Sequence, residues 1–279
     1  MSIGSFEGRG VVVTGGGSGI GAATCRLLAL RGAQVGVLDR RGGAARELAD
    51  EIGGLALHCD ITDPDAVDAA LTTADAELGG LSALVNNAGI GNLKRLEDYT
   101  DAEVERIWRV NFSGTYACLR SAVPYLRAAG EVRGSPSSVV NVASLSAVRP
   151  TLGEAPYSAA KAAVVGLTMA AALEWAPEVR VNCVSPGFIH TELNDLLVAD
   201  EDARSGIEER TPLGRIGSVS ETAALIAFLL SDEAGYMTGQ NLVLDGGTML
   251  SSAQMDPVLG PLLDTFTEAS RTGTPGERN

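Results

Sequence analysis

The sequence predicts an α/β fold in which helices cover both faces of a doubly wound parallel sheet of about seven strands. Short apolar runs rich in β-branched residues alternate with longer segments of helical periodicity along most of the chain. The strand-like runs, such as 11–13 and 179–184, are apolar throughout instead of alternating with polar residues. Strands with this pattern are buried on both faces, as they are between two layers of helices.

The predicted elements follow one another as strand and helix in turn. Expected strands are 11–13, 34–38, 55–59, 83–86, 138–142, 179–184 and 241–244, and expected helices are 20–30, 44–51, 64–78, 101–126, 157–175 and 221–230. Strand and helix units in a row favour parallel pairing, because a parallel strand needs a crossover connection. Of the 279 residues, we therefore assign 1–250 to one domain, with a substrate loop near 188–216, and 251–279 to a C-terminal extension.

The composition is that of a globular protein with an acidic surface. Hydrophobic residues make up 45% and charged residues 20%, and 21 basic against 35 acidic residues give a formal charge of −14. A negative field of this size disfavours nucleic acid, anionic membranes and acidic protein partners. We expect none of these as partners, and no stretch has the roughly 20 uninterrupted apolar residues of a membrane span.

The four cysteines lie in apolar segments without the spacing of a zinc site or a redox motif; they are Cys25, Cys59, Cys118 and Cys183. This pattern predicts buried free thiols in a reducing compartment. The first eight residues lack the basic and apolar regions of a signal peptide, so we expect the protein in the cytoplasm. His58 and His190 stand alone, and no metal site is predicted.

A glycine-rich turn follows the first strand, where a helical pattern begins at once. Its residues run from Thr14 to Gly21, and Gly17, Gly19 and Ala22 fit the spacing of a dinucleotide-binding turn. Such a turn lets the backbone approach a diphosphate, whose charge the N-terminus of the helix stabilises. The turn therefore predicts a Rossmann-like nucleotide site.

Asp39 ends the second strand 20 residues after Gly19. A carboxylate there accepts hydrogen bonds from the hydroxyls of an adenosine ribose and repels a 2′-phosphate. We therefore expect NAD as cofactor, with NADP less favoured. Arg40 and Arg41 follow directly and would partly neutralise such a phosphate.

Tyr157 and Lys161 lie four residues apart, which places them on one face of a predicted helix, about one turn from each other. An ammonium group and the positive end of a helix both favour the ionised form of a phenol. The pair therefore predicts a tyrosine whose lowered pKa lets it exchange a proton with an alcohol or ketone near neutral pH.

Two further motifs follow predicted strands. Asn86 to Gly89 come after the fourth strand, and Pro186 and Gly187 come after the sixth. With the glycine turn and the tyrosine motif, the sequence from about residue 8 to residue 247 resembles the single-domain type of the short-chain dehydrogenase/reductase family. The resemblance implies a catalytic set of Asn111, Ser144, Tyr157 and Lys161. In it Ser144 binds the substrate oxygen, Tyr157 transfers the proton, Lys161 holds the ribose and lowers the tyrosine pKa, and Asn111 anchors a water chain.

The resemblance also implies the residues that contact the cofactor. Besides Tyr157 and Lys161 they are Gly15, Gly17, Ser18, Gly19, Ile20, Asp39, Arg40, Asp60, Ile61, Asn87, Ala88, Gly89, Pro186, Gly187, Ile189 and Thr191. Relatives usually assemble as tetramers, so the resemblance implies a homotetramer, through the helices near 101–126 and 157–175 and the last helix and strand.

The expected reaction is hydride transfer between NAD(H) and a neutral, fairly hydrophobic secondary alcohol or its ketone. The residues expected to line the substrate pocket are mostly apolar: Ser146, Val148, Leu152, Phe188 and Leu193. Glu154, three residues before Tyr157, is near enough to contact the substrate, but we interpret it as a solvated loop carboxylate. An apolar cluster at 255–266 predicts that the C-terminal extension docks across the substrate mouth.

Two other functions share parts of this pattern. An NADPH-dependent 3-oxoacyl-[acyl-carrier-protein] reductase has the same motifs, but Asp39 and the charge of −14 disfavour NADPH and an acidic carrier protein. A catalytically silent nucleotide-binding scaffold is the alternative outside enzymes. It would have no chemical need for Ser144, Tyr157 and Lys161 together.

Overall fold

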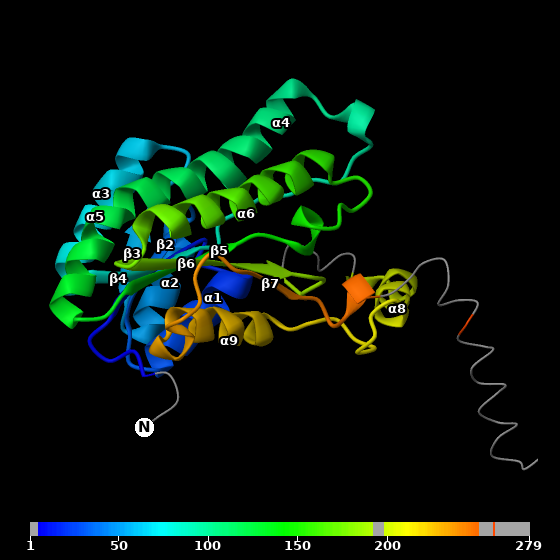
Figure 1. Ribbon diagram of the computed structural model, residues 1–279. Coiled ribbons are helices and arrows are strands. Elements are labelled where there is room, and N and C mark those ends of the chain that lie inside the picture. The colour runs from blue at the N-terminus through cyan, green and yellow to red at the C-terminus, as the bar shows by residue number, and fades with distance from the viewer. Residues whose placement is uncertain (1–4, 192–197, 251–258, 260–279) are drawn as a thin grey trace, which may run out of the picture.

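The computed structural model describes residues 5–191, 198–250 and 259. Its centre is one sheet of seven strands in the order β3-β2-β1-β4-β5-β6-β7, and every neighbouring pair is parallel (Figure 1). The strands are β1 Gly10–Thr14, β2 Gln34–Asp39, β3 Leu55–His58, β4 Leu81–Asn86, β5 Ser137–Val142, β6 Val179–Pro186 and β7 Asn241–Leu244. This sheet confirms the predicted Rossmann-like α/β fold.

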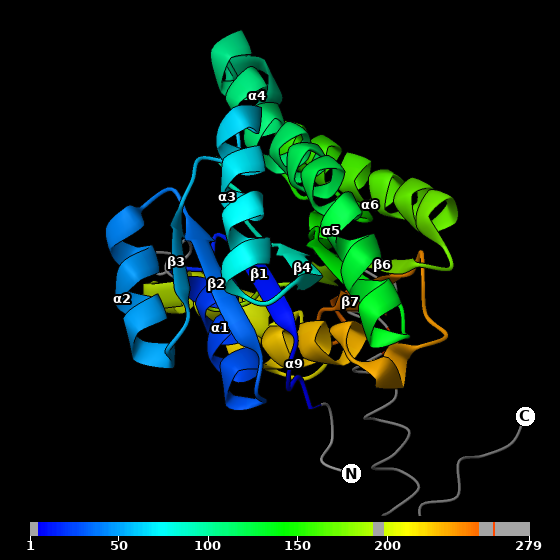
Figure 2. The same cartoon turned by 90° about the vertical axis from the view of Figure 1, so that its left-hand side faces the viewer.

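Helices form one layer on each face of the sheet (Figures 1 and 2). One layer holds α1 Gly19–Leu30, α2 Gly42–Ile52 and α9 Val219–Leu230, and the other holds α3 Pro64–Glu77, α4 Asp101–Trp108, α5 Thr115–Arg133 and α6 Ala155–Trp175. The short helix α8, Glu201–Glu209, lies beyond the sheet, within the expected substrate loop. The predicted extension at 251–279, apart from Leu259, lies outside the described residues, as does its expected docking at 255–266.

The two layers give the protein two apolar cores, one on each side of the sheet. Successive residues of β1 alternate between them: Val11 and Val13 pack with α1 and α9, whereas Val12 packs with α3 and α5. This alternation follows from the pleat of a strand, which sends neighbouring side chains to opposite faces. All four cysteines are buried and free, as the sequence predicted.

The predicted helix 101–126 is present as one helical run, but it is not regular α-helix throughout and it ends later than predicted. The segment begins as α4, widens into one π-helical turn over Arg109–Gly114, and continues as α5 to Arg133. Gly114 packs against the side chain of Ile61, since a Cβ on this glycine would lie 2.6 Å from Ile61 Cδ1. The widened turn holds Asn111, and such turns often occur at functional sites.

One helix within the described ranges, α6, is long and apolar enough by composition to cross a membrane. It packs on the sheet instead. Val164 belongs to a core cluster with Ala143 and Cys183, and Ala171 and Ala172 pack in the core on the α3 and α5 side. One face of α6 therefore belongs to the core, while its outer face carries exposed apolar side chains such as Met169 and Leu173.

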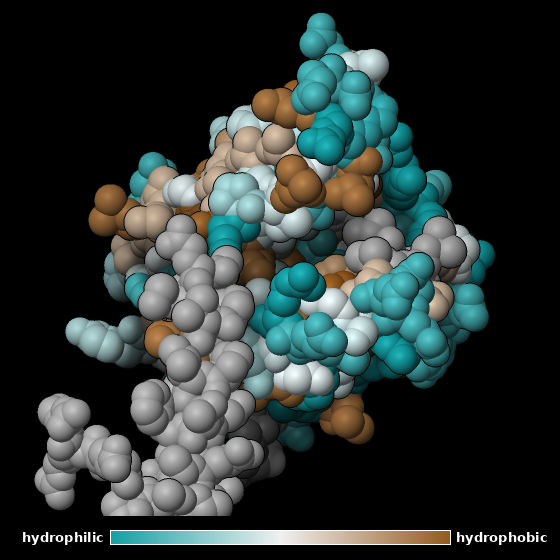
Figure 3. Space-filling model, turned by 90° about the vertical axis from the view of Figure 1, so that its right-hand side faces the viewer, coloured by the Kyte–Doolittle hydropathy of each residue, from teal (hydrophilic) through white to brown (hydrophobic). Residues whose placement is uncertain are grey.

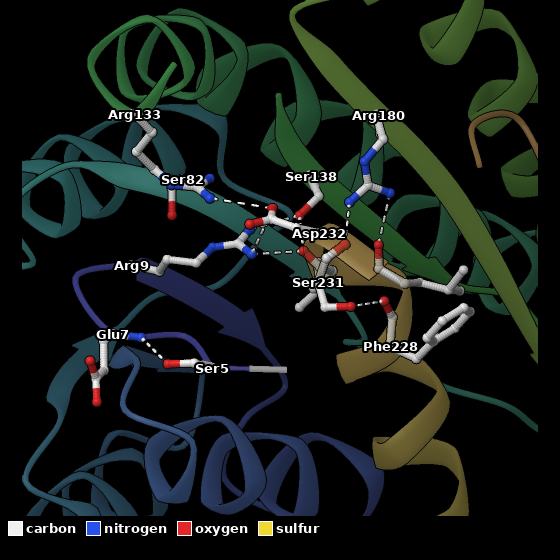
Figure 4. Close-up of polar contacts among 12 residues, drawn as sticks. Ser5, Glu7, Arg9, Ser82, Arg133, Ser138, Arg180, Phe228, Ser231 and Asp232 are labelled. Atoms are coloured by element: carbon white, nitrogen blue, oxygen red, sulfur yellow. Dashed lines mark hydrogen bonds and ion pairs between the residues drawn. The ribbon is translucent and has the colours of Figure 1, made fainter. Parts of the chain in front are cut away.

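At the amino ends of the strands, three arginines converge on the end of α9 (Figure 4). Arg180 donates to the carbonyls of Leu229 at 3.0 Å and Ser231 at 2.9 Å, and Arg9 donates to Leu230 O at 2.9 Å. Arg9 and Arg133 lie 3.9 and 3.4 Å from the Asp232 carboxylate. These contacts satisfy carbonyls that a helix leaves unpaired at its C-terminus, and the cations complement its dipole.

Replacing Arg180 with alanine should lower the free energy of unfolding by about 3 kcal/mol, because the change leaves buried carbonyls without donors. Urea denaturation followed by circular dichroism measures the effect. The control is Arg127→Ala, which breaks an exposed ion pair with Glu178 of 3.7 Å and should cost less than about 1 kcal/mol. Equal effects of the two changes would contradict the structural role of Arg180.

Candidate active site

The residues predicted for catalysis and cofactor binding lie mainly at the carboxyl ends of the strands. β1 and β4 are neighbours in the sheet, and the chain order reverses between them. In open α/β sheets, ligands bind at such a reversal, outside the carboxyl ends. Figure 3 looks onto this side of the molecule, where single apolar side chains lie among a mostly hydrophilic surface.

The glycine turn between β1 and α1 is built by close backbone contacts. Gly15 and Gly19 have positive φ angles of 62° and 52°, which favour glycine. A Cβ on Gly21 would lie 2.1 Å from the carbonyl oxygen of Gly15, so this position excludes every side chain. Asn87 Nδ2 donates to Thr14 O and Gly15 O, both at 3.1 Å, and holds the turn against the end of β4.

A cavity of about 350 Å³ lies at this turn. Its wall consists of Gly17, Ser18, Gly19, Ala22, Ala23, Arg26, His190, Thr191 and Val219. Ser18 is the N-cap of α1, and its side chain makes no cap hydrogen bond. The first backbone amides of this helix are therefore not occupied by the serine hydroxyl and can donate to a bound anion. The arrangement fits the diphosphate of a dinucleotide, since a helix N-terminus and a glycine backbone stabilise such a charge.

Asp39 lies beside this turn and is nearly fully buried. Its Oδ2 accepts from Gly17 N at 3.0 Å, and its Oδ1 accepts from Arg41 N at 2.9 Å. The guanidinium of Arg41 lies 3.6 Å from the same carboxylate and donates to Ser18 Oγ at 2.6 Å. Asp39 is therefore held next to the predicted ribose position. Nearby, the Nε2 atom of His58 lies 3.1 Å from the carbonyl oxygen of Arg40.

The other predicted cofactor residues follow the ends of β3, β4 and β6. Asp60 is exposed and accepts from the amide and hydroxyl of Thr62, both at 2.9 Å, and these bonds hold its pKa below the usual range. Thr14 Oγ1 accepts from the amides of Asn87 and Ala88, at 3.0 and 3.1 Å. Gly187 packs against Asp245 and Ile189 bridges to Gly217, and at the end of this segment His190 and Thr191 line the cavity.

Ser144, Tyr157 and Lys161 come together at the ends of β5 and α6. A hydrogen bond links Ser144 to Tyr157, and the Lys161 ammonium lies 5.8 Å from the centre of the Tyr157 ring. Lys161 is buried and donates to the carbonyl of Val142 at 2.8 Å. The structure thus brings together three of the four residues predicted for catalysis, with Tyr157 and Lys161 one helical turn apart as expected.

The expected lowering of the tyrosine pKa was wrong for the protein alone. Burial raises the pKa of Tyr157 to about 12, the hydrogen bond with Ser144 offsets part of the rise, and the charge of Glu154 adds to it. Burial also lowers the pKa of Lys161 to about 8. Loss of water around each group disfavours its charged form. Tyr157 is therefore a neutral phenol near pH 7, a proton donor.

This environment makes stability depend on pH through Lys161. Its pKa falls from an ordinary 10.5 to about 8 on folding, so the unfolded chain binds more protons between these values. The contribution of Lys161 to the free energy of unfolding should therefore rise with pH from about 8 to 10.5, by up to about 3 kcal/mol. The buried cysteines act in the opposite sense above pH 9, because burial raises the pKa of their thiols. Lys161→Met removes only the lysine contribution, so urea denaturation at pH 7 and 10 should show the stability of wild type rising relative to that of the variant, and a difference that stays the same at both pH values would refute it.

Asn111 is fully buried in the π-helical turn. Its Nδ2 donates to the carbonyls of Ile90 and Ile107, at 2.8 and 2.9 Å, and its Oδ1 accepts from Ile90 N at 3.3 Å. A Cβ on Gly89 would lie 2.8 Å from Asn111 Oδ1 and 3.3 Å from Lys161 Nζ. Gly89 thus lets the asparagine and the lysine approach each other.

The predicted substrate residues differ in their surroundings. Val148 and Leu152 are exposed, Phe188 is half-buried, and Ser146 is buried with its hydroxyl on Glu154. Leu193 lies outside the described residues. Glu154 is partly buried and hydrogen-bonded, which corrects its interpretation as a solvated loop carboxylate.

One feature of the site was missed from the sequence. His190 appeared as a lone loop histidine, yet it lines the cavity at the glycine turn, next to Thr191. The sequence did contain a signal for this position, because His190 lies within the predicted cofactor-binding segment that follows Gly187. Among the residues that the structure describes, no group of three His, Cys, Asp or Glu side chains could hold a metal ion.

Comparison with known proteins identifies the family. A family model described as enoyl-(acyl carrier protein) reductase matches residues 15–249. A short-chain type dehydrogenase/reductase from Mycobacterium marinum superposes with a TM-score of 0.82 at 35% identity, over 88% of this chain and 98% of that one. This chain belongs to the short-chain dehydrogenase/reductase family.

Relatives within the short-chain dehydrogenase/reductase family carry different names. A 3-alpha-(or 20-beta)-hydroxysteroid dehydrogenase of Mycobacterium tuberculosis is 38% identical over 91% of this chain and 94% of its own length. A cis-4-hydroxycyclohexanecarboxylate dehydrogenase of Sinomonas cyclohexanicum is 42% identical, over 87% and 97%. A 3-ketoacyl-(acyl-carrier-protein) reductase of Brucella melitensis, complexed with NADH, has a TM-score of 0.81 at 36% identity, over 88% and 99%.

These relationships support a reaction class. As a short-chain dehydrogenase/reductase, the chain is an oxidoreductase of a family that uses nicotinamide cofactors, and its named relatives support interconversion of alcohols and ketones. The glycine turn and its cavity fit such a cofactor.

Proposed function

We propose that this protein is an NAD(H)-dependent oxidoreductase that interconverts a neutral, fairly hydrophobic secondary alcohol and its ketone, with Tyr157 as general acid and base. The observation that carries the proposal is the meeting of Ser144, Tyr157 and Lys161 on the same edge of the sheet as the cavity at the glycine turn. A nucleotide-binding scaffold without activity would have no need of this polar cluster.

Each side chain has a role that its surroundings support. Tyr157, a neutral phenol, donates a proton to the carbonyl oxygen, and Ser144 donates a hydrogen bond to the same oxygen. Lys161, held by Val142 O, keeps a positive charge near the phenol and binds the ribose. Asn111 fixes the backbone at Gly89 and Ile90. It would anchor the water chain that returns a proton to Tyr157. The bound nicotinamide supplies or accepts the hydride.

The proposed cofactor preference rests on Asp39, which offers buried carboxylate oxygens next to the glycine turn. A ribose 2′-phosphate would lie against this charge, so kcat/KM for NADH should exceed that for NADPH by roughly tenfold or more. Asp39→Ser should bring the kcat/KM values for NADH and NADPH closer together, since Arg41 would then face the 2′-phosphate. Steady-state kinetics at 340 nm with both cofactors measures it. A wild-type enzyme that uses NADPH equally well would overturn the preference.

The proposed substrate is tested by a panel of ketones. Steroid ketones and the anion 4-oxocyclohexanecarboxylate represent the named dehydrogenase relatives, and neutral cyclohexanones test the proposed neutral substrate. A 3-oxoacyl thioester represents the carrier-protein reductase, which is the second candidate because its solved structure covers 88% of this chain. We expect cyclic ketones to be reduced with NADH. Efficient reduction of the thioester alone, with NADPH, would favour the second candidate.

We also propose a homotetramer in the cytoplasm, without nucleic acid or membrane partners. The buried free cysteines favour a reducing compartment. On the outer layer, Trp108, Tyr116, Met169 and Leu173 are 41 to 84% exposed on α4, α5 and α6. Large apolar groups gathered in this way mark an association surface.

Light scattering after size exclusion should therefore give the mass of four chains at micromolar concentration. Leu173→Glu puts a charge on the most exposed of these side chains and should reduce the mass. A monomeric wild-type protein would refute the proposed assembly.

A further inference from the structure

Glu154 occupies the turn between the two catalytic segments. It is the residue directly before α6, three positions ahead of Tyr157, and it is partly buried. Its Oε2 accepts from Ser146 Oγ at 2.7 Å, and the same hydroxyl lies 3.2 Å from Thr151 Oγ1. Because Ser146 is only 5% exposed, a buried hydroxyl holds this carboxylate toward the protein.

Ser146 in turn is fixed relative to the catalytic serine. Its amide donates to Ser144 Oγ at 3.1 Å, so Glu154, Ser146 and Ser144 form one connected set. The charge of Glu154 acts on the phenol of Tyr157, whose pKa it raises, and on the phenol of Tyr99. The negative charge of Glu154 therefore acts at the position where Tyr157 and Ser144 would bind the substrate oxygen.

Within the described ranges, no cation pairs with Glu154. Lys94 pairs with Glu103 at 2.5 Å, and Arg149 donates to Thr248 O at 2.8 Å. The other carboxylate oxygen, Oε1, accepts no hydrogen bond from the residues that the structure describes, and it is not enclosed. A negative charge and an acceptor are thus available to a bound molecule.

We propose that Glu154 is a specificity-determining residue that selects substrates by charge, admitting neutral molecules with a hydrogen-bond donor and rejecting carboxylates. This inference rests on the proposed function, because that function places the substrate oxygen at Tyr157. An anionic group near Glu154 meets a like charge that no cation of the described residues neutralises. At separations of about 7 Å and an effective dielectric constant of about 40, the repulsion amounts to roughly tenfold in affinity.

The test uses two ligands of nearly equal shape that differ in charge, cyclohexanecarboxylate and cyclohexanecarboxamide. Isothermal titration calorimetry of the enzyme with bound NADH gives their dissociation constants without any turnover. Wild type should bind the amide about tenfold more tightly than the acid. Glu154→Gln keeps an oxygen for Ser146 and should reduce this ratio to near one. Glu154→Asp, which keeps the charge, should retain most of it.

Glu131→Gln is the matched control, because it removes one exposed carboxylate at the end of α5, away from the site, and should leave the ratio unchanged. Equal ratios in wild type and Glu154→Gln would overturn the proposal, and so would failure of both ligands to bind wild type. Failure of the proposed function is a separate result. It would appear as a full panel of ketones left unreduced while the charge preference for bound ligands persists.

Discussion

The Tyr157→Phe enzyme is expected to lose between about a hundredfold and ten-thousandfold in kcat, because the phenol is the proposed proton donor to the substrate oxygen. The ring, which lies 5.8 Å from the Lys161 ammonium, is retained, so NADH affinity should stay close to that of wild type. Steady-state kinetics and a fluorescence titration with NADH measure the two quantities. A variant that kept more than about a tenth of the activity would contradict the role of Tyr157.

Ser144→Ala provides the comparison for this result. It leaves the proton donor in place and removes the hydrogen bond that Ser144 makes with Tyr157. We expect a smaller loss, of roughly a hundredfold, typical of removing one donor to a developing charge. A larger loss of kcat in Ser144→Ala than in Tyr157→Phe would contradict the assignment of Tyr157 as the proton donor.

Gly21→Ala should weaken NADH binding by between about ten- and a hundredfold. The added methyl group would lie 2.1 Å from Gly15 O and 2.6 Å from Asn87 Nδ2, so the turn must move to accept it. Overpacking of this kind costs about 1–3 kcal/mol. Fluorescence titration with NADH and thermal melting measure the losses of affinity and stability.

Gly43→Ala is the control for this change. No atom lies within 4 Å of a Cβ at that position, and its backbone conformation is one that alanine adopts. NADH binding should stay at the wild-type level, and α2 should gain slightly in stability. Normal cofactor affinity in Gly21→Ala would contradict the placement of the diphosphate at this turn.

Local sequence signals were sufficient for the sheet and for much of the candidate site. Valine-rich runs such as β1 are apolar because helices cover both faces, and this property is visible residue by residue. The spacing of Tyr157 and Lys161 is likewise a local helical property, and their neighbouring positions on α6 agree with it.

The remaining features depend on contacts between distant segments. The π-helical turn around Asn111 accompanies the packing of Gly114 on Ile61, which no periodicity within 101–126 reveals. The raised pKa of Tyr157 results from burial in the folded protein, which the spacing of Tyr157 and Lys161 does not reveal. Glu154 was misjudged for the same reason, because its partner Ser146 lies in a separate turn.

Transfer of deuterium from [4,4-²H₂]NADH tests the central claim most directly. The enzyme is incubated with the labelled cofactor and a cyclic ketone from the panel, and the alcohol is analysed by mass spectrometry. We predict one deuterium at the carbinol carbon for each NADH oxidised, and almost no labelled alcohol with Tyr157→Phe. An alcohol without deuterium, or no ketone-dependent oxidation of NADH across the panel, would contradict the proposed reaction.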